Sequence, residues 1–256
     1  MWSCLKVNSC PCKEGPLCGI RQGGPLVKSY HFKAGERPEC YLEHVMFCIE
    51  EWHSIAARFT KPIVHRFAST FKLKPNDDLE RDIKWALTLS IINHDVGKLT
   101  LEYQTGKWYR HELLGAYIVR KIFNECFDKE KPYFELLRDI TAASVYLHHE
   151  ALQLSRGWRG LRSPTLDYLM SKVSEFNFTF KAELKSAFNT LNEYGGLTVC
   201  YELPNNIEGK DLVRQLGEMI SALDGSHNPG AVRLVIALML LPLTIIDDKA
   251  AKKGRG

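Results

Sequence analysis

The chain has 256 residues, 45% of them hydrophobic and 25% charged, with a formal net charge of +4. This length allows one large core or at most two small domains, and the composition is that of an ordinary soluble protein. The mildly basic balance is compatible with a nucleic-acid partner, but it does not by itself argue for one.

Neither end of the sequence indicates export or a membrane span. Met1 is followed by Trp2, Ser3 and cysteines, without a positive start and an apolar run. The longest apolar run, residues 234–246, is interrupted by Pro242 and falls short of the roughly 20 residues that cross a bilayer. We therefore expect a buried core helix there, in a soluble cytoplasmic protein.

Eight cysteines fall into two sets. Four crowd the N-terminus: Cys4, Cys10, Cys12 and Cys18. Their spacing could hold zinc or an iron–sulfur cluster, but it lacks the usual C-x2-C pairs, so disulfides or incidental cysteines in a loose extension stay open. The others are dispersed, and we expect them to be small buried hydrophobes: Cys40, Cys48, Cys126 and Cys200.

The first third of the chain passes from irregular to helical. Residues 1–40 are rich in Gly, Pro and Cys and predict an irregular extension with a short strand at 25–32. Apolar residues at spacings of three and four predict a helix over 41–59, whereas 61–73 is ambiguous. Asn76 or Asp77 can cap the next helix, which ends in His94-Asp95. Gly97 then permits a backbone turn that other residues avoid.

The remainder also has mostly helical periodicity. Residues 99–108 predict a loop or short helix, and helices are expected from His111 and over 132–149, 164–176, 181–191, 210–223 and 231–251. A loop is expected over 151–163. The stretch 197–203 reads as a strand that pairs with 176–180. We therefore predict an all-α fold with one small β-hairpin, with residues 41–256 forming a single domain.

The stretch 91–98 places a neutral nitrogen ligand, His94, beside an anionic oxygen ligand, Asp95, which suits a divalent cation. Further candidates stand at helix ends or on an apolar helix edge: His44, His111, His148, His149 and Asp247. Each alone has an ordinary explanation as a cap or a boundary residue. Their occurrence together favours a site.

These residues carry a family resemblance. The motifs are His-Asp-Val-Gly-Lys with Tyr-Gln over 94–104, Arg-His-Glu from Arg110, the pair His148-His149, Asp247 with an alanine three residues on, and Leu-Glu-His44. In combination they resemble the HD phosphohydrolase superfamily, and more specifically the stand-alone HD nuclease of type I CRISPR interference. Glu150 departs from the glycine often found there, and the N-terminal cysteines have no counterpart.

The resemblance implies a mostly helical HD domain with two divalent ions. The first ion would be bound by His44, His94, Asp95 and Asp247. Asp95 would bridge to the second, held by His111, His148 and His149. Such a nitrogen-rich set tolerates Fe, Co or Ni as well as Mg or Mn.

Three further residues are candidates for contact with substrate. Lys98 could act in catalysis by stabilising charge on the phosphate, or be a solvated lysine. Gln104 could orient a loop or the ligand, and Arg110 could contact a phosphate or form a surface salt bridge. Aromatic residues could stack on bases or serve the core: Trp108, Tyr109 and Trp158. The remaining histidines are expected to be structural or on the surface: His31, His53, His65 and His227.

The predicted function is hydrolysis of single-stranded DNA, or RNA, by a metal-activated water in CRISPR interference. No G-x4-G-K-[ST] motif occurs, so the helicase would be a separate chain, acting with an RNA-guided surveillance complex. One alternative is an HD phosphohydrolase of small nucleotides, with the same metal site. Another is a non-catalytic binding module.

Overall fold

The computed structural model describes residues 39–108, 110–149, 170–180 and 182–255. Four predictions fall outside these ranges in whole or in part: the cysteine cluster, the strand expected at 25–32, the loop expected over 151–163 and the first six residues of the helix expected over 164–176. The division into an extension and a domain from residue 41 therefore stays a prediction. The described part is mostly helical, as predicted, and its apolar side chains form one contiguous core.

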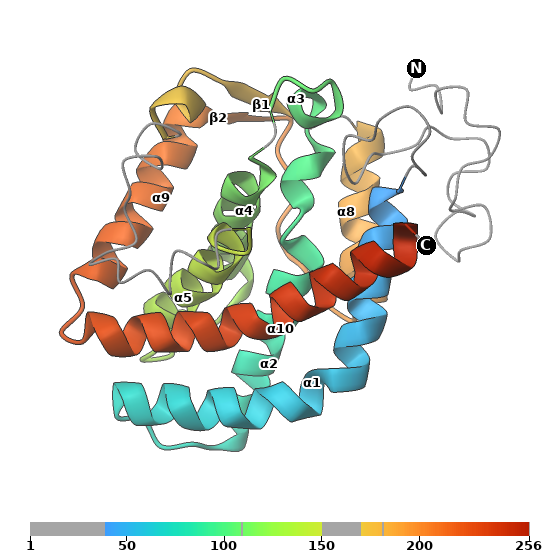
Figure 1. The fold of residues 1–256 in the computed structure, drawn as a ribbon. Helices are drawn as coiled ribbons and strands as arrows, with labels where there is room; N and C mark the ends of the chain where they lie inside the picture. The colour runs from blue at the N-terminus through green and yellow to red at the C-terminus, as the bar shows by residue number, and fades with distance from the viewer. Residues whose placement is uncertain (1–38, 109, 150–169, 181, 256) are drawn as a thin grey trace.

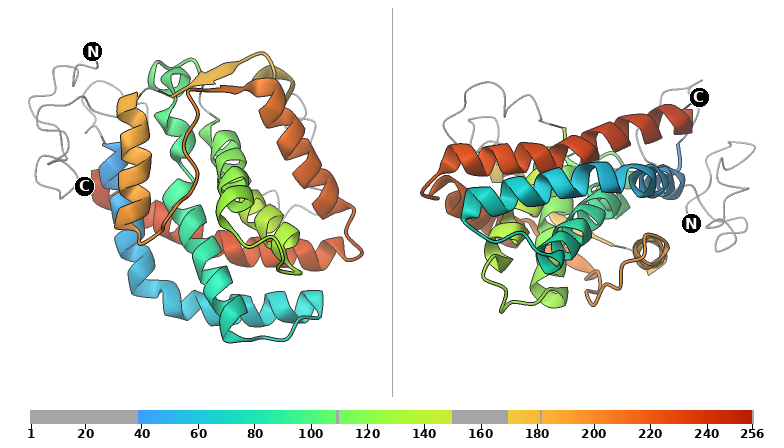
Figure 2. Two further views of the ribbon diagram at one scale, coloured as in Figure 1. Left: turned by 180° about the vertical axis from the view of Figure 1, so that it is seen from behind. Right: turned by 90° about the horizontal axis from the view of Figure 1, so that it is seen from below.

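Two long helices, α1 (Tyr41–Phe71) and α10 (Pro229–Arg255), run side by side (Figures 1 and 2). The ambiguous stretch 61–73 continues α1 through Pro62, which removes one backbone hydrogen bond and accounts for the bend in Figure 1. Surface ion pairs of 3.0 Å, Lys249–Glu51 and Lys253–Glu50, join the two helices near the C-terminal end of α10.

By length and composition, α10 could cross a membrane. Core helices of soluble proteins share these properties, and here Val235, Met239 and Leu243 are fully buried. The helix packs against α1 and against α5 (Phe134–Tyr146). Its apolar first half therefore serves the core, as the sequence predicts.

The helix α2 (Asp77–Asn93) begins at Asn76, whose side chain accepts a hydrogen bond from the Leu79 backbone N–H at 2.9 Å. The chain then tightens into η3 (Val96–Leu99) and α3 (Leu101–Gln104). The next helix, α4 (His111–Cys126), packs on α5. These elements enclose the end of α2, so the residues after it are buried.

The expected hairpin does not form; a two-stranded antiparallel sheet is present instead, and its second strand differs from the one expected. Strand β1 (Asn177–Thr179) pairs antiparallel with β2 (Asn206–Glu208), and residues 197–203 lie in an irregular segment. That segment has apolar alternation because Leu197, Tyr201 and Leu203 are buried against the core, which does not require a strand partner. The helices α8 (Ala182–Tyr194) and α9 (Gly209–Asp224) flank it.

The dispersed cysteines only partly follow expectation. Cys40 and Cys48 are buried, Cys126 is half-buried, and Cys200 is exposed. The prediction of burial is therefore wrong for Cys200, which follows from its place in the irregular segment. Its backbone N–H donates to Cys126 Sγ at 2.8 Å, which ties this segment to the end of α4.

Candidate metal centre

Five chain segments converge on one buried point. His44 lies in the first turn of α1, His94 and Asp95 follow α2, and His111 is the first residue of α4. His148 and His149 follow the end of α5, and Asp247 lies in α10. Six of the seven residues thus lie in the first turn of a helix or within three residues after its end, whereas Asp247 lies inside α10.

Four of these residues form a first group: His44, His94, Asp95 and Asp247. One potential ligand atom from each lies within 4.8 Å of the others. His44 Nε2 is 3.1 Å from Asp247 Oδ1 and 3.4 Å from Asp95 Oδ2. His94 Nε2 is 3.4 Å from the same Asp95 oxygen.

A second group has the same compactness: Asp95, His111, His148 and His149. His111 Nε2 lies 2.7 Å from Asp95 Oδ1, and His148 Nε2 lies 3.8 Å from it. His149 Nε2 is 3.1 Å from His111 Nε2. The two oxygens of Asp95 thus face different groups, Oδ2 the first and Oδ1 the second.

Hydrogen bonds at the other ring nitrogen orient three of the histidines. The Nδ1 atoms of His94 and His148 donate to the carbonyl oxygens of Ile91 and Val145, at 2.8 and 2.6 Å. His44 Nδ1 lies 3.0 Å from the buried Glu39 carboxylate. Such partners fix the tautomer and leave Nε2 as the coordinating atom.

Close packing of α4 requires glycine at two positions near the site. A Cβ on Gly97 would lie 2.3 Å from the His111 carbonyl oxygen, and one on Gly115 would lie 2.4 Å from that of His94. Gly97 is not among the glycines with positive φ, so the expected special backbone turn is wrong. Its role is to let η3 approach the start of α4, which brings Asp95 to His111.

The second group is electrically neutral apart from Asp95. Burial lowers the pKa of His111 to about 4, and burial together with the charge of His94 lowers that of His148 to about 3. Both rings are therefore neutral near pH 7, with a lone pair on the nitrogen that faces the site.

The first group differs in its response to protons. Burial lowers the pKa of His44, but interactions with Cys48, Asp247 and Glu39 outweigh this effect and raise it well above the usual value. Burial raises the pKa of Asp247, yet its interactions with the nearby imidazoles of His44 and His94 bring it well below its usual range. In the first group, Asp247 is therefore ionised and lies next to His44, which binds a proton readily.

Lys98 and Gln104 adjoin the site from η3 and α3. Lys98 Nζ donates to Asp95 Oδ2 at 2.5 Å and is buried, so the reading as a solvated lysine is wrong. The Asp95 charge raises the pKa of Lys98 despite burial, which opposes it. Gln104 Nε2 donates to the Lys98 carbonyl oxygen at 2.7 Å, so it holds the η3 backbone.

Arg110 and Trp108 lie just before α4. The Arg110 guanidinium pairs with Glu112, and its side chain is 29% exposed. Trp108 is buried against Phe176 and Phe178, which places it in the core. The other two aromatic candidates lie outside the described residues: Tyr109 and Trp158.

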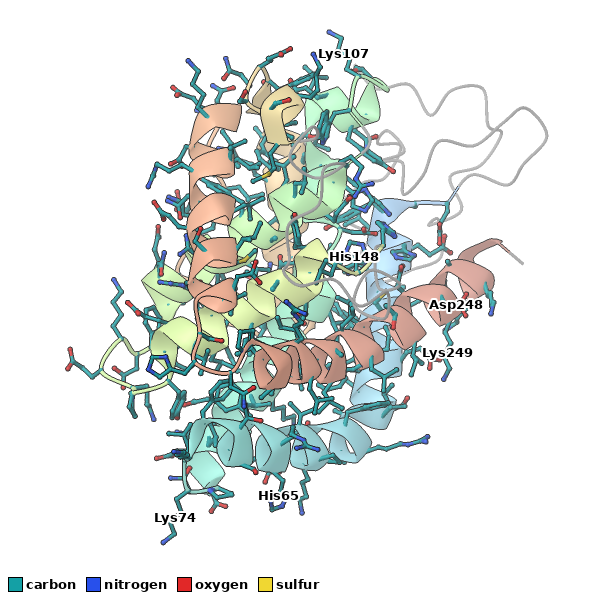
Figure 3. The ribbon with its side chains drawn as sticks, turned by 60° about the vertical axis from the view of Figure 1, so that its left-hand side comes forward. His65, Lys74, Lys107, His148, Asp248 and Lys249 are labelled. Atoms are coloured by element: carbon teal, nitrogen blue, oxygen red, sulfur yellow. The ribbon has the colours of Figure 1, made fainter. Side chains whose placement is uncertain are left out.

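The remaining histidines do not reach the site where the structure describes them. His53, His65 and His227 are exposed, as expected. Figure 3 shows His65 projecting from the end of the molecule far from His148. In the same view Asp248 points outward from α10, where it pairs with Lys252 at 2.6 Å. His31 lies outside the described residues.

Two buried residues near His44 were missed by sequence reasoning. Glu39 lies five residues before His44, and Cys48 lies one helical turn after it, with Sγ 3.7 Å from His44 Nε2. The i, i+4 spacing of His44 and Cys48 could have indicated that both share a helix face. Glu39 gave no signal, because it precedes the helix and its contact depends on the local turn.

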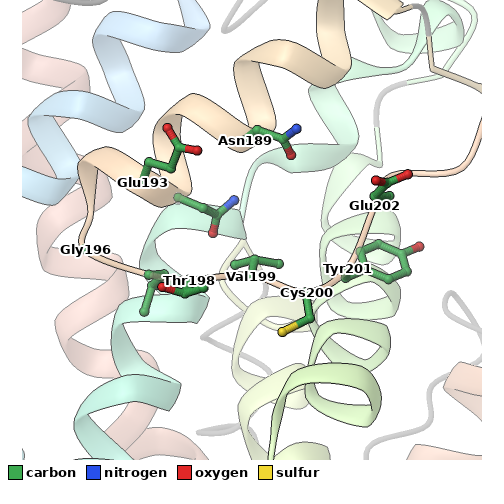
Figure 4. Close-up of a pocket in the computed structure, with 10 residues that line it drawn as sticks. Asn189, Glu193, Gly196, Thr198, Val199, Cys200, Tyr201 and Glu202 are labelled. Carbon is green, nitrogen blue, oxygen red and sulfur yellow. The ribbon is translucent and has the colours of Figure 1, made fainter.

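A pocket of about 530 Å³ lies elsewhere, between α8 and the segment 196–202 (Figure 4). Asn189, Glu193 and Tyr201 are among its lining residues, and none of the clustered histidines or aspartates is. Small-molecule binding in this pocket would therefore not involve the clustered histidines directly.

The clustered residues fit a divalent metal on structural grounds. Within the described part of the chain, Nε2 of His94 and Nε2 of His148 are buried and have no hydrogen-bond partner. Leaving buried polar atoms unpaired costs about 1–3 kcal/mol each. A cation held by the first group would satisfy the nitrogen of His94, and one held by the second group would satisfy that of His148. Imidazole with carboxylate suits Mn, Fe, Co, Ni or Zn.

Comparisons with known proteins agree with the fold. The chain is 26% identical over 224 residues to "CRISPR-associated endonuclease Cas3-HD" of Pyrococcus furiosus, covering 84% of this chain and 89% of that protein. It is 25% identical over 226 residues to the protein of the same name from Methanocaldococcus jannaschii, covering 84% and 86%. The corresponding protein of Thermoproteus tenax is 29% identical over 185 residues, covering 67% and 73%.

A solved structure is also similar. The CRISPR-associated Cas3 HD domain protein from Methanocaldococcus jannaschii aligns with a TM-score of 0.59 at 22% identity, covering 84% of this chain and 98% of that one. No family model matches the sequence. The resemblance inferred from the motifs is thus confirmed: the chain is similar over most of its length to proteins named CRISPR-associated endonuclease Cas3-HD, and it has the mostly helical HD-domain fold.

Proposed function

We propose that the chain is a metal-dependent nuclease that hydrolyses phosphodiester bonds of single-stranded DNA, with RNA as the other candidate substrate. One observation carries the proposal. Two compact groups of four potential ligands share Asp95, and its two oxygens face different groups. A shared carboxylate is how two ions are held about 3.5–4 Å apart in phosphodiester-cleaving sites.

In this proposal the ligand set is the one implied by the motifs. His44, His94, Asp95 and Asp247 hold the first ion, and Asp95 with the three remaining histidines holds the second. When bound, such a pair activates water and stabilises the attacking and leaving oxygens. No side-chain nucleophile is required of the chain, whose part is to fix the ligands in place from α10 and from the ends of four other helices.

Lys98 is proposed to act on the phosphate. Its ammonium group is buried beside Asp95, where a positive charge is worth more than in water. A rotation of the flexible side chain would move Nζ from Asp95 to a phosphate oxygen. Gln104 supports this by holding the Lys98 backbone. Arg110, partly exposed beside His111, is proposed to contact a neighbouring phosphate.

The partners follow from the similarities and from the sequence. Relatives named CRISPR-associated endonucleases support a role in CRISPR interference. Since the chain has no P-loop motif, strand separation would need a helicase on another chain, guided by an RNA-containing surveillance complex. We place this activity in the cytoplasm.

The test compares Asp95→Asn with Asp248→Asn in cleavage of end-labelled single-stranded DNA and RNA with Mn2+. Asp248 is exposed on α10 and serves as the control. We expect Asp95→Asn to abolish cleavage and Asp248→Asn to leave it unchanged. Undiminished cleavage by Asp95→Asn would overturn the site.

Two other outcomes would favour one of the two alternative functions. Release of phosphate from nucleotides, without cleavage of either polymer, would indicate a small-nucleotide phosphohydrolase with the same metal centre. A wild-type protein that retains no metal after reconstitution, measured by elemental analysis, would indicate a binding module.

A further inference from the structure

A thiol lies against the first group. Cys48 is fully buried in α1, one turn after His44, and its Sγ is 3.7 Å from His44 Nε2. His44, Cys48 and His94 each offer a ligand atom within 4.8 Å of the others. Cys48 is not part of the set formed with Asp95 and Asp247, so it adjoins the two histidines without replacing a carboxylate.

The unpaired nitrogen of His94 points to a ligand at the same place. Its Nε2 is buried without a hydrogen-bond partner among the described residues, while Nδ1 is anchored on Ile91. His44 is likewise anchored through Nδ1 by Glu39. Two oriented imidazoles and a thiol therefore meet on one face of the first group.

The separation between sulfur and nitrogen fits a shared ion. Zinc–nitrogen bonds are about 2.0–2.1 Å and zinc–sulfur bonds about 2.3 Å, so two such ligands of one ion lie at most about 4.4 Å apart. The 3.7 Å between Cys48 Sγ and His44 Nε2 is within this limit. A role in apolar packing alone does not require Cys48 Sγ to lie this close to His44 Nε2.

We propose that His44, Cys48 and His94 form an alternative ligand set for an ion in the first group, which thiol-binding borderline ions such as Zn2+ and Co2+ use and the harder ions Mg2+ and Mn2+ do not. This proposal rests on the metal site of the proposed function. On binding, the Cys48 S–H bond breaks, its proton goes to solvent, and a sulfur–metal bond forms, with no change of oxidation state. Cys48 is thus a determinant of metal selectivity.

The test uses Co2+, whose thiolate complexes absorb in the near ultraviolet. Because the N-terminal cysteines could also bind cobalt, they are first replaced by serine in the full chain: Cys4, Cys10, Cys12 and Cys18. In that background we expect a thiolate–cobalt band that Cys48→Ser and Cys48→Ala both abolish. Cys40→Ser, which alters another buried cysteine near the start of α1, should leave it.

Affinity measurements complete the test. Zn2+ binding should weaken at least about tenfold in both Cys48 variants, while Mn2+ binding and thermal melting change little. Persistence of the band in Cys48→Ser, or equal losses for Zn2+ and Mn2+, would overturn the proposal and leave the proposed function standing. Failure of the wild type to bind Mn2+ would instead overturn the proposed function itself.

Discussion

The two groups of the candidate metal centre share Asp95 but are built differently. The first group adds a second carboxylate, Asp247, and a histidine backed by the buried Glu39. The second adds three histidines and no further acid. Oxygen ligands and their negative charge strengthen binding of hard ions, whereas neutral nitrogens favour borderline transition metals. We therefore expect the first group to bind its ion more tightly at neutral pH.

The pKa values of the histidines also differ between the two groups. In the first group, the charge interaction with Cys48 and hydrogen bonds with Asp247 and Glu39 raise the pKa of His44, so a proton and a metal compete there. In the second group, burial keeps His111 and His148 neutral at neutral pH, so a metal meets little competition from protons but also little charge. Three changes test whether the two groups differ in this way.

Removal of Asp247 should have the largest effect. Asp247→Ala takes the only unshared carboxylate from the first group, so we expect roughly one bound ion fewer and at least a ~100-fold loss of DNA cleavage, more than loss of an outer partner causes. Asp248→Ala changes the adjacent residue, which pairs with Lys252 on the surface, and should alter neither. Metal content and cleavage rate check both variants. Equal behaviour of the two would contradict the assignment of Asp247.

Glu39→Gln should act only on the first group. The amide can still accept from His44 Nδ1 but carries no charge, so the ring becomes a weaker ligand. Changes to such outer partners typically cost about 10–100-fold in metal affinity. Titration calorimetry should show this loss for one ion and an unchanged second ion. The control Glu51→Gln removes a surface pair with Lys249, and a loss there of similar size would indicate a general charge effect.

In the metal-free protein, the two groups should contribute to stability with opposite dependence on pH. The folded pKa of His148 is about 3, below its unfolded value, so stability falls as pH drops from about 6.5, by up to about 1.4 kcal/mol per pH unit. His44 has a raised folded pKa, so its contribution is present at acid pH and is lost as pH rises through that value.

Both effects are measured by thermal unfolding in the presence of a chelator from about pH 4 to about pH 8, a range that brackets the pKa of histidine in an unfolded chain. His148→Gln should flatten the acid-side loss of stability. His44→Gln should leave the acid side unchanged and instead remove a loss of stability that the wild type shows as pH rises above about 6.5. Identical profiles for the two variants would show that the groups do not differ in their electrostatics.

The sequence determined the helices and the ligand types. Apolar periodicity indicated α1, α2, α4, α5 and α10, because a helix that buries one face must repeat apolar residues at its own period. The motifs around His94-Asp95 selected seven residues, and the structure brings all seven together. The choice of Asp247 over Asp248 also came from the motif spacing, and Asp247 is the one that faces His44.

Only the structure showed which buried residues contact His44 and why glycine is needed at 97. Glu39 and Cys48 meet His44 through the start of α1, where neither residue has a motif of its own. Gly97 is needed because α4 approaches its backbone, a contact between segments that no local pattern records. The strand that pairs with β1 is β2 rather than 197–203, because apolar residues of 197–203 are buried against the core instead. Local periodicity specifies which face of an element is apolar, whereas distances between elements depend on packing of the whole chain.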